Sequence, residues 1–176
     1  MIEKQPLYKL SSDKTNERIV CNYKNKFINF DNLKGILKKK KIPESPDMLY
    51  INNDKKEIWF VEFKSSKKDN LDKIKEKIKL KRKFFAGIFL IYEIFCKKSC
   101  DYKKYKKYYF IVFNKKNENY ENELINIFEQ NNTRDIEFGL ADLKPTFVND
   151  VITDNCENFI KLFSQRFQIK FEENLN

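Results

Sequence analysis

The sequence predicts a layered fold of the α/β or α+β class. Three observations support this: a hairpin pattern over residues 48–64, a helical period over 71–95 and an apolar strand pattern over 108–114. In chain order the predicted elements run α, β, β, α, β, α, with a less regular C-terminal part. A chain of 176 residues favours one domain, residues 1–176, with a core of useful size.

The N-terminal region predicts two helices. Ser11 or Ser12 could cap a helix that begins near Asp13. Apolar residues then recur at helical spacing: Ile19, Tyr23, Phe27 and Phe30. Asp31 could cap a second, short helix over 32–40, with a basic C-terminal end. The inward residues of this second helix would be Leu33, Ile36 and Leu37.

The hairpin follows two prolines, Pro43 and Pro46, which end any helix and favour extended chain. We expect the first strand over 48–51 and the second over 57–64, where Ile, Trp, Phe and Val are frequent. The turn between them, 52–56, is rich in Asn and Asp.

A long helix is expected after the hairpin, with Asp69 or Asn70 as its cap. Its period comes from Leu71, Ile74, Ile78, Phe85, Ile88, Tyr92 and Phe95. Lysines crowd the first half. The second half, 84–95, is apolar nearly all round and could be a buried helix end or a separate strand; we interpret it as helix.

The C-terminal half predicts a basic loop with interleaved tyrosines over 101–107, then a strand over 108–114. Such a loop could stack on bases and hold phosphates, or could simply be solvated. A helix over 120–130, a short strand over 136–140 and a last helix over 158–167 complete the prediction.

The net charge of +10 has two interpretations. It suits a polyanionic partner, most simply nucleic acid. It also suits an AT-rich genome that inflates lysine, because only four of the 36 basic residues are arginine: Arg18, Arg82, Arg134 and Arg166. The chain has no histidine, which excludes Ser–His–Asp and Cys–His nucleophilic systems and His-ligated zinc.

The four cysteines are Cys21, Cys96, Cys100 and Cys156. The start of the chain has no apolar leader, and no apolar run is long enough to span a membrane. We therefore expect a soluble intracellular protein with no membrane partner. We also expect no disulfides, with the thiols buried rather than bound to zinc or an iron–sulfur cluster.

Charged residues gather at one end of the predicted hairpin. Asp47 precedes the first strand, and Glu62 and Lys64 end the second, where residues two apart share a face. If the strands pair, the Asp47 side chain can lie close to both Glu62 and Lys64. Two carboxylates and the Phe63 carbonyl oxygen could hold Mg²⁺ or Mn²⁺, while Lys64 could orient water or neutralise charge during phosphodiester hydrolysis.

The combination of Pro46-Asp47 with Glu62-Phe63-Lys64 on an apolar strand resembles the PD-(D/E)xK nuclease superfamily, which includes restriction endonucleases and archaeal-type Holliday junction resolvases. The resemblance covers about residues 12–114. It implies a restriction-endonuclease-like mixed central sheet flanked by helices. It also implies Asp47 and Glu62 as metal ligands and Lys64 as the catalytic lysine. Many members carry a further glutamate on the preceding helix, for which Glu17 is the candidate.

The predicted function is a metal-dependent endonuclease acting on DNA, of the restriction or junction-resolving type. A homodimer is expected from the resemblance and from double-strand chemistry. Phosphate contacts are expected from basic residues downstream of the site: Lys67, Lys68, Lys75, Lys79 and Arg82. Three alternatives stay open: an RNA endonuclease of the cap-snatching type, a catalytically inactive nucleic-acid-binding module, and a structural protein whose charge reflects codon usage.

Overall fold

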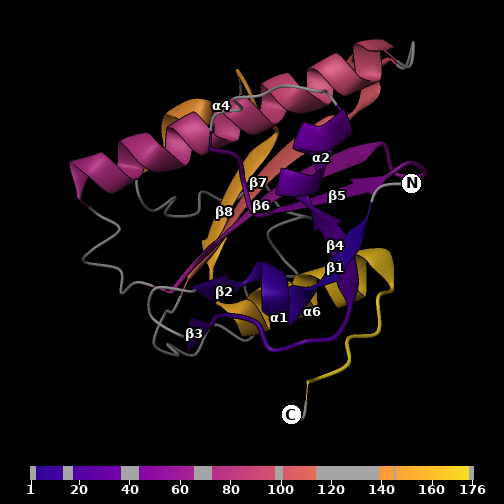
Figure 1. Ribbon diagram of the computed structural model, residues 1–176. Helices are drawn as coiled ribbons and strands as arrows, with labels where there is room; N and C mark the ends of the chain where they lie inside the picture. The colour runs from indigo at the N-terminus through magenta and orange to yellow at the C-terminus, as the bar shows by residue number, and fades with distance from the viewer. Residues whose placement is uncertain are drawn as a thin grey trace.

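The computed structural model describes residues 3–13, 18–36, 44–65, 73–97, 101–113, 139–144 and 146–174. These residues form a six-stranded mixed sheet with helices on both faces, so the predicted α/β class is confirmed (Figure 1). The sheet order is β1 (Lys4–Pro6), β4 (Lys26–Asn29), β5 (Met48–Asn52), β6 (Glu57–Lys64), β7 (Lys106–Phe113) and β8 (Asp150–Asp154). Neighbouring strands from β1 to β6 are antiparallel, whereas β6, β7 and β8 are parallel.

The hairpin of β5 and β6 forms as predicted. Met48 pairs with Val61 and Asn52 with Glu57, and the chain reverses over the intervening polar residues. Lys56 adopts the positive φ of 52° that closes the turn. The hairpin sits at the centre of the sheet, because β5 also pairs with β4 and β6 also pairs with β7.

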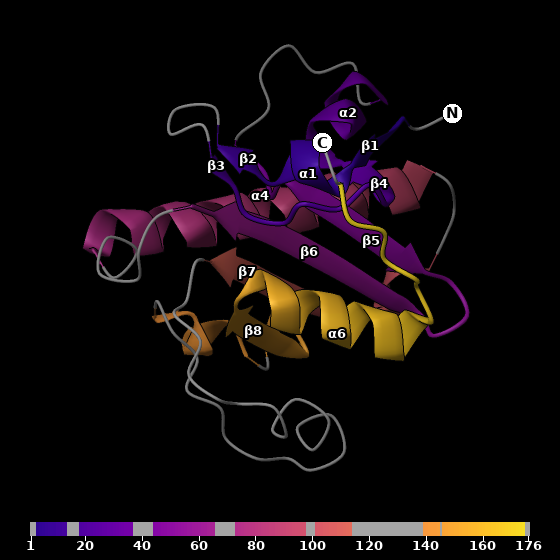
Figure 2. The same ribbon diagram turned by 90° about the horizontal axis from the view of Figure 1, so that it is seen from below.

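Alternate residues of β6 face two separate hydrophobic cores. Phe60 packs under the long helix α4 (Ile74–Lys97), whereas Trp59, Val61 and Phe63 pack over α6 (Cys156–Phe167). Figure 1 shows α4 on one face of the sheet, and Figure 2 shows α6 across the other. The β6 strand is buried on both faces, which explains its nearly continuous apolar sequence.

Helix α4 is continuous, so the interpretation of residues 84–95 as helix is confirmed. Its inward face differs from the predicted one. The buried apolar side chains are Leu80, Phe84, Ala86, Leu90, Ile91, Ile94 and Phe95. Four residues of the predicted period, Ile74, Ile78, Phe85 and Tyr92, are exposed. Among the described residues, no helix combines the length and apolarity needed to cross a bilayer.

The predicted helix from Asp13 to Phe30 is wrong. The segment contains β2 (Ser12–Asp13), β3 (Arg18–Ile19) and β4, after the short helix α1 (Leu7–Leu10). Pairing with distant partners decides this: β4 fits between β1 and β5, with Phe27 buried on the α6 side and Ile28 against the α4 side. The second predicted helix exists as α2 (Phe30–Ile36), which begins two residues earlier than expected.

The C-terminal predictions are mixed. β7 begins at Lys106, so the predicted basic loop is shorter, and it contains the 3₁₀ turn η1 (Tyr102–Lys104). Helix α6 is confirmed and is capped by Asn155, whose side chain accepts from Asn158 N. Gly139 and Leu140 do not form a strand and lead into the 3₁₀ turn η3 (Ala141–Leu143). The predicted helix over 120–130 lies outside the described residues, and β1 and β8 were not predicted.

The expectation of unpaired cysteines is also wrong. Cys21 and Cys156 form a disulfide whose Cα atoms are 5.6 Å apart, across a sequence separation of 135 residues. The bond ties the segment before β4 to the first residue of α6. Disulfides are common in oxidising compartments and rare in the cytosol, so the cysteines no longer support the predicted intracellular location. Cys96 is a free, exposed thiol.

Candidate active site

The charged end of the hairpin brings three predicted residues together. Because Met48 pairs with Val61, Asp47 lies beside Glu62 at the next position along the two strands. The Asp47 Oδ2 atom accepts a hydrogen bond of 2.8 Å from the backbone N of Phe63. Glu62 and Lys64 share the face of β6 that lies under α4, and Lys64 Nζ is 3.3 Å from Glu62 Oε1. The hairpin therefore brings Asp47, Glu62 and Lys64 together at one end of the sheet.

Glu62 is the most deeply buried charge of this cluster, with only 1% of its side-chain surface exposed. Its two carboxylate oxygens differ in their contacts. Oε1 contacts two ammonium groups, whereas Oε2 is buried and has no hydrogen-bond partner among the described residues. A buried carboxylate oxygen without a partner is costly, so this atom calls for a water, an ion or a catalytic role to explain it.

The second ammonium group belongs to Lys83 of α4, which the sequence did not single out. Its Nζ donates to Glu62 Oε1 at 2.6 Å and lies 3.6 Å from Asp47 Oδ1. Only 14% of the Lys83 side chain is exposed. One signal could have identified it: Lys83 lies three residues after Leu80 and four before Gly87, on the inward face of the helix. A lysine on a buried helical face needs a partner.

Glu76, in the first turn of α4, adds a third carboxylate near the strand end. Its Oε2 atom is 3.6 Å from Lys64 Nζ. Lys64 thus bridges Glu62, which is buried, and Glu76, which is half-exposed. The five side chains, three acidic and two basic, come from the start of β5, the end of β6 and the first half of α4.

The environment shifts the protonation of this cluster. Burial, followed by the nearby charge of Glu62, raises the pKa of Asp47 to about 7, although Lys83 and the Phe63 N–H oppose the shift. Asp47 keeps 29% of its side chain exposed, so water also reaches the carboxylate. Burial lowers the pKa of Lys83, but the charges of Glu62 and Asp47 outweigh burial and leave the pKa above its ordinary value. Lys83 is therefore protonated at neutral pH.

The fit to a metal ion can be judged from the donors. Among the described residues, no three His, Cys, Asp or Glu side chains are arranged to hold an ion. Mg²⁺ needs fewer than three protein ligands, because it usually binds one or two carboxylates together with waters and substrate phosphates. Asp47 and Glu62 supply two hard oxygen donors, and Glu62 Oε2 is available. Since the N–H and C=O of a strand residue point to the same side, we expect the Phe63 carbonyl to face the Asp47 side as well. These donors fit Mg²⁺ or Mn²⁺.

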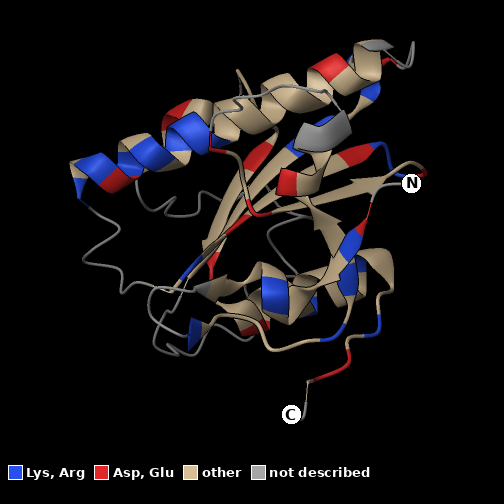
Figure 3. Ribbon diagram, in the orientation of Figure 1, with Lys and Arg blue, Asp and Glu red and all other residues tan. Residues whose placement is uncertain are grey.

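The remaining predicted site residues fall into two groups. Glu17, Lys67 and Lys68 lie outside the described residues. Lys75, Lys79 and Arg82 lie on α4, where their spacing of four and three residues places them on one side of the helix. Figure 3 shows the basic residues of α4 in its N-terminal half, the half that covers the strand end with Glu62 and Lys64. Lys75 and Arg82 are exposed, and Lys79 is half-exposed.

Comparison with protein-family models, with curated proteins and with solved structures finds no match to this chain.

Proposed function

We propose that this protein is a Mg²⁺-dependent endonuclease of the restriction-endonuclease-like kind, which hydrolyses phosphodiester bonds in DNA. The single observation that supports the proposal best is the orphaned Oε2 of Glu62, buried beside a second carboxylate and followed two residues later by Lys64. A buried carboxylate with one oxygen unsatisfied has a hard donor to offer a divalent ion.

Each residue has a defined part in the proposed reaction. Asp47 and Glu62 would hold the ion, which when bound would polarise the phosphate and lower the pKa of a water. The Phe63 N–H fixes the orientation of the Asp47 carboxylate. Lys64 places a positive charge at the same edge, where it can orient the attacking water and stabilise negative charge on the phosphate.

The basic side of α4 supports a polyanionic substrate. Lys75, Lys79 and Arg82 extend along the helix from the end at which the acidic residues lie, so a phosphate backbone that crosses the cluster would also meet these cations.

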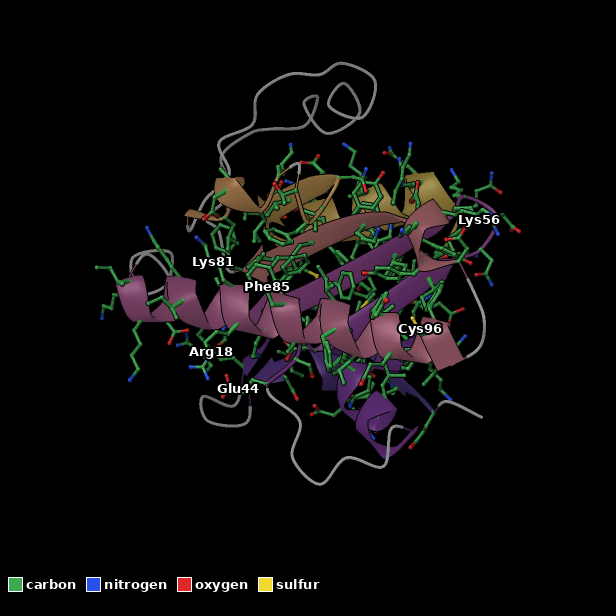
Figure 4. All side chains as sticks on the ribbon, turned by 90° about the horizontal axis from the view of Figure 1, so that it is seen from above. Arg18, Glu44, Lys56, Lys81, Phe85 and Cys96 are labelled. Carbon is green, nitrogen blue, oxygen red and sulfur yellow. A yellow bond between two sulfur atoms is a disulfide. The ribbon has the colours of Figure 1, made fainter. Side chains whose placement is uncertain are left out.

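A homodimer belongs to the proposal, because two copies of one site suit the cutting of two strands. Segment 84–95 of α4 carries apolar residues on both sides of the helix. Phe84 and Ile91 are in the core, whereas Phe85, Phe89 and Tyr92 are exposed, and their spacing of four and three residues places them on one side of α4. Figure 4 labels Phe85 on this helix. Exposed aromatic surface of this kind is available for self-association. Sedimentation of the wild type and of Phe89→Glu would test this part.

The nuclease proposal is tested by incubating the protein with supercoiled, linear, branched and single-stranded DNA and with RNA, in Mg²⁺ or Mn²⁺. We expect DNA cleavage that falls by about 10²–10⁴-fold in Asp47→Ala and Lys64→Gln. Lys104→Gln, at the opposite end of the strands, is the matched control and should keep full activity. Cleavage that persists in both site variants would overturn the proposed site.

The same assay separates the alternatives. Cleavage of RNA alone would favour the RNA endonuclease. Metal-independent binding without cleavage of any substrate would favour an inactive binding module.

A further inference from the structure

The ammonium group of Lys83 lies between the two carboxylates proposed to hold the metal. Its Nζ is 2.6 Å from Glu62 Oε1 and 3.6 Å from Asp47 Oδ1. Lysine carries a compact point charge, so among side chains it is the closest substitute for a bound cation. The side chain is largely enclosed, and its pairing with Glu62 is the shortest contact recorded within this cluster.

We infer that Lys83 is the resident counter-ion of the metal-free site, and that a divalent cation binds by displacing this ammonium from Glu62. The inference rests on the proposed function, since it concerns the same carboxylates. A divalent ion held by Asp47 and Glu62 would lie within a few ångströms of Lys83 Nζ. Two cations at that distance repel each other, and the repulsion is strongest beside the buried Glu62 carboxylate, where solvent screens it least.

Three features allow the exchange. Lys83 reaches the site from α4, whereas both carboxylates belong to the hairpin, so its flexible stem can withdraw without moving a ligand. Lys64 also contacts Glu62 Oε1 and remains as a counter-charge after Lys83 has left. Glu62 Oε2 is already free of hydrogen-bond partners among the described residues, so an incoming ion has an oxygen to bind before the ammonium departs.

Lys83 then has two opposing effects. It stabilises the metal-free fold by neutralising a buried carboxylate. It weakens metal binding, because only molecules in which the ammonium has withdrawn are competent to bind. The residue is a positioning and regulatory group whose signature is a gain of metal affinity when it is removed.

The test compares Lys83→Gln with Lys81→Gln, the same change on the same helix at an exposed ion pair with Asp142. Mn²⁺ binding to the full chain is measured by calorimetry at pH 8, without nucleic acid. We expect Lys83→Gln to bind Mn²⁺ about tenfold more tightly than the wild type, and Lys81→Gln to change affinity less than about twofold. Unchanged or weaker binding in Lys83→Gln would overturn the inference, as would the absence of Mn²⁺ binding in every variant.

A second measurement covers the case in which Lys83→Gln does not fold. The wild type with ¹⁵N-labelled lysine should show a slowly exchanging side-chain ammonium signal from Lys83, assigned by its loss in Lys83→Arg. Mg²⁺ should shift or broaden that signal selectively; a signal unchanged at saturating Mg²⁺ contradicts displacement. The outcomes also separate the two proposals: displacement without cleavage of any nucleic acid refutes the nuclease function alone, and cleavage without displacement refutes this inference alone.

Discussion

Gly87 of α4 lies directly against the ring of Pro46, the residue before Asp47. A Cβ atom at Gly87 would come within 2.9 Å of Pro46 Cδ and 3.1 Å of Phe60 Cδ1. The missing side chain lets the helix approach the start of β5 closely, and Lys83, one turn earlier, thereby reaches Asp47 and Glu62.

Gly87→Ala should therefore destabilise the protein, although alanine favours helix by about 1 kcal/mol over glycine. The proline ring is rigid and buried, so the helix has to move, and we expect a net loss of about 1–3 kcal/mol in the free energy of unfolding. Urea denaturation measures the loss. In a double-mutant cycle, Pro46→Ala should relieve much of it; strictly additive effects would contradict the contact as the cause.

Asp47→Asn should change the pH dependence of stability. The folded pKa of Asp47 is raised to about 7, mainly by burial and then by the charge of Glu62, so the folded state binds the proton more tightly than the unfolded state does. Stability contributed by this proton is present below about pH 4 and is lost as pH rises to about 7. Without metal at pH 8, we expect Asp47→Asn to be more stable than the wild type by on the order of 1–2 kcal/mol, a value kept low because water reaches the carboxylate.

Asp54→Asn is the matched control, because it makes the same change at an exposed residue of the hairpin turn. Thermal or urea denaturation between pH 4 and pH 8 in EDTA would show the difference. If the wild type and Asp47→Asn lose stability in parallel over that range, Asp47 does not carry a raised pKa.

The hairpin and its charged end could be predicted because every signal for them is local. A run of β-formers, a polar turn and a Pro-Asp entry define the strands, and residues two apart on a strand must share a face. Lys83 could not be selected by the same means. It is one lysine among many in α4, and it becomes distinctive only once the buried face of the helix is known.

The buried face of α4 could not be identified from the sequence, because apolar residues lie on both sides of the helix. Phe85 and Tyr92 follow the helical period as well as Phe84 and Ile91 do, yet the first two are exposed and the last two are buried. The N-terminal error has a similar origin: a chance helical spacing of aromatic residues competed with strand pairing between segments far apart in the sequence. Long-range pairing of this kind leaves no local pattern.

Neutralising the basic side of α4 should weaken nucleic-acid binding in a salt-dependent way. We expect Lys75→Gln, Lys79→Gln and Arg82→Gln each to lower the slope of log affinity against log salt by roughly 1, similarly for different DNA sequences. Fluorescence anisotropy with Ca²⁺ in place of Mg²⁺ measures this without cleavage. Lys104→Gln, which is exposed at the other end of the sheet, should leave the slope unchanged. Equal effects of all four variants would indicate that affinity depends on the net charge of the protein and not on the position of these cations on α4.

The disulfide between Cys21 and Cys156 should contribute measurably to stability. It joins the segment before β4 to the start of α6, and Ser11 supports the same segment through hydrogen bonds of 3.0 Å to the backbone of Cys21. Closing so long a loop restricts the unfolded chain, so we expect Cys156→Ala to lower the free energy of unfolding by about 2–4 kcal/mol under oxidising conditions. Dithiothreitol should lower the free energy of unfolding of the wild type by a similar amount and leave that of Cys156→Ala unchanged.

Cys96→Ala is the control for this last prediction, because Cys96 is a free thiol on the exposed side of α4 and should not alter stability or its response to reductant. Intact mass after alkylation in denaturant without reductant would show directly whether Cys21 and Cys156 are bonded, because unfolding exposes the buried Cys21. Modification of both under these non-reducing conditions would mean that the two thiols only pack together. In that case the intracellular location predicted from the sequence would regain the support that the disulfide removes.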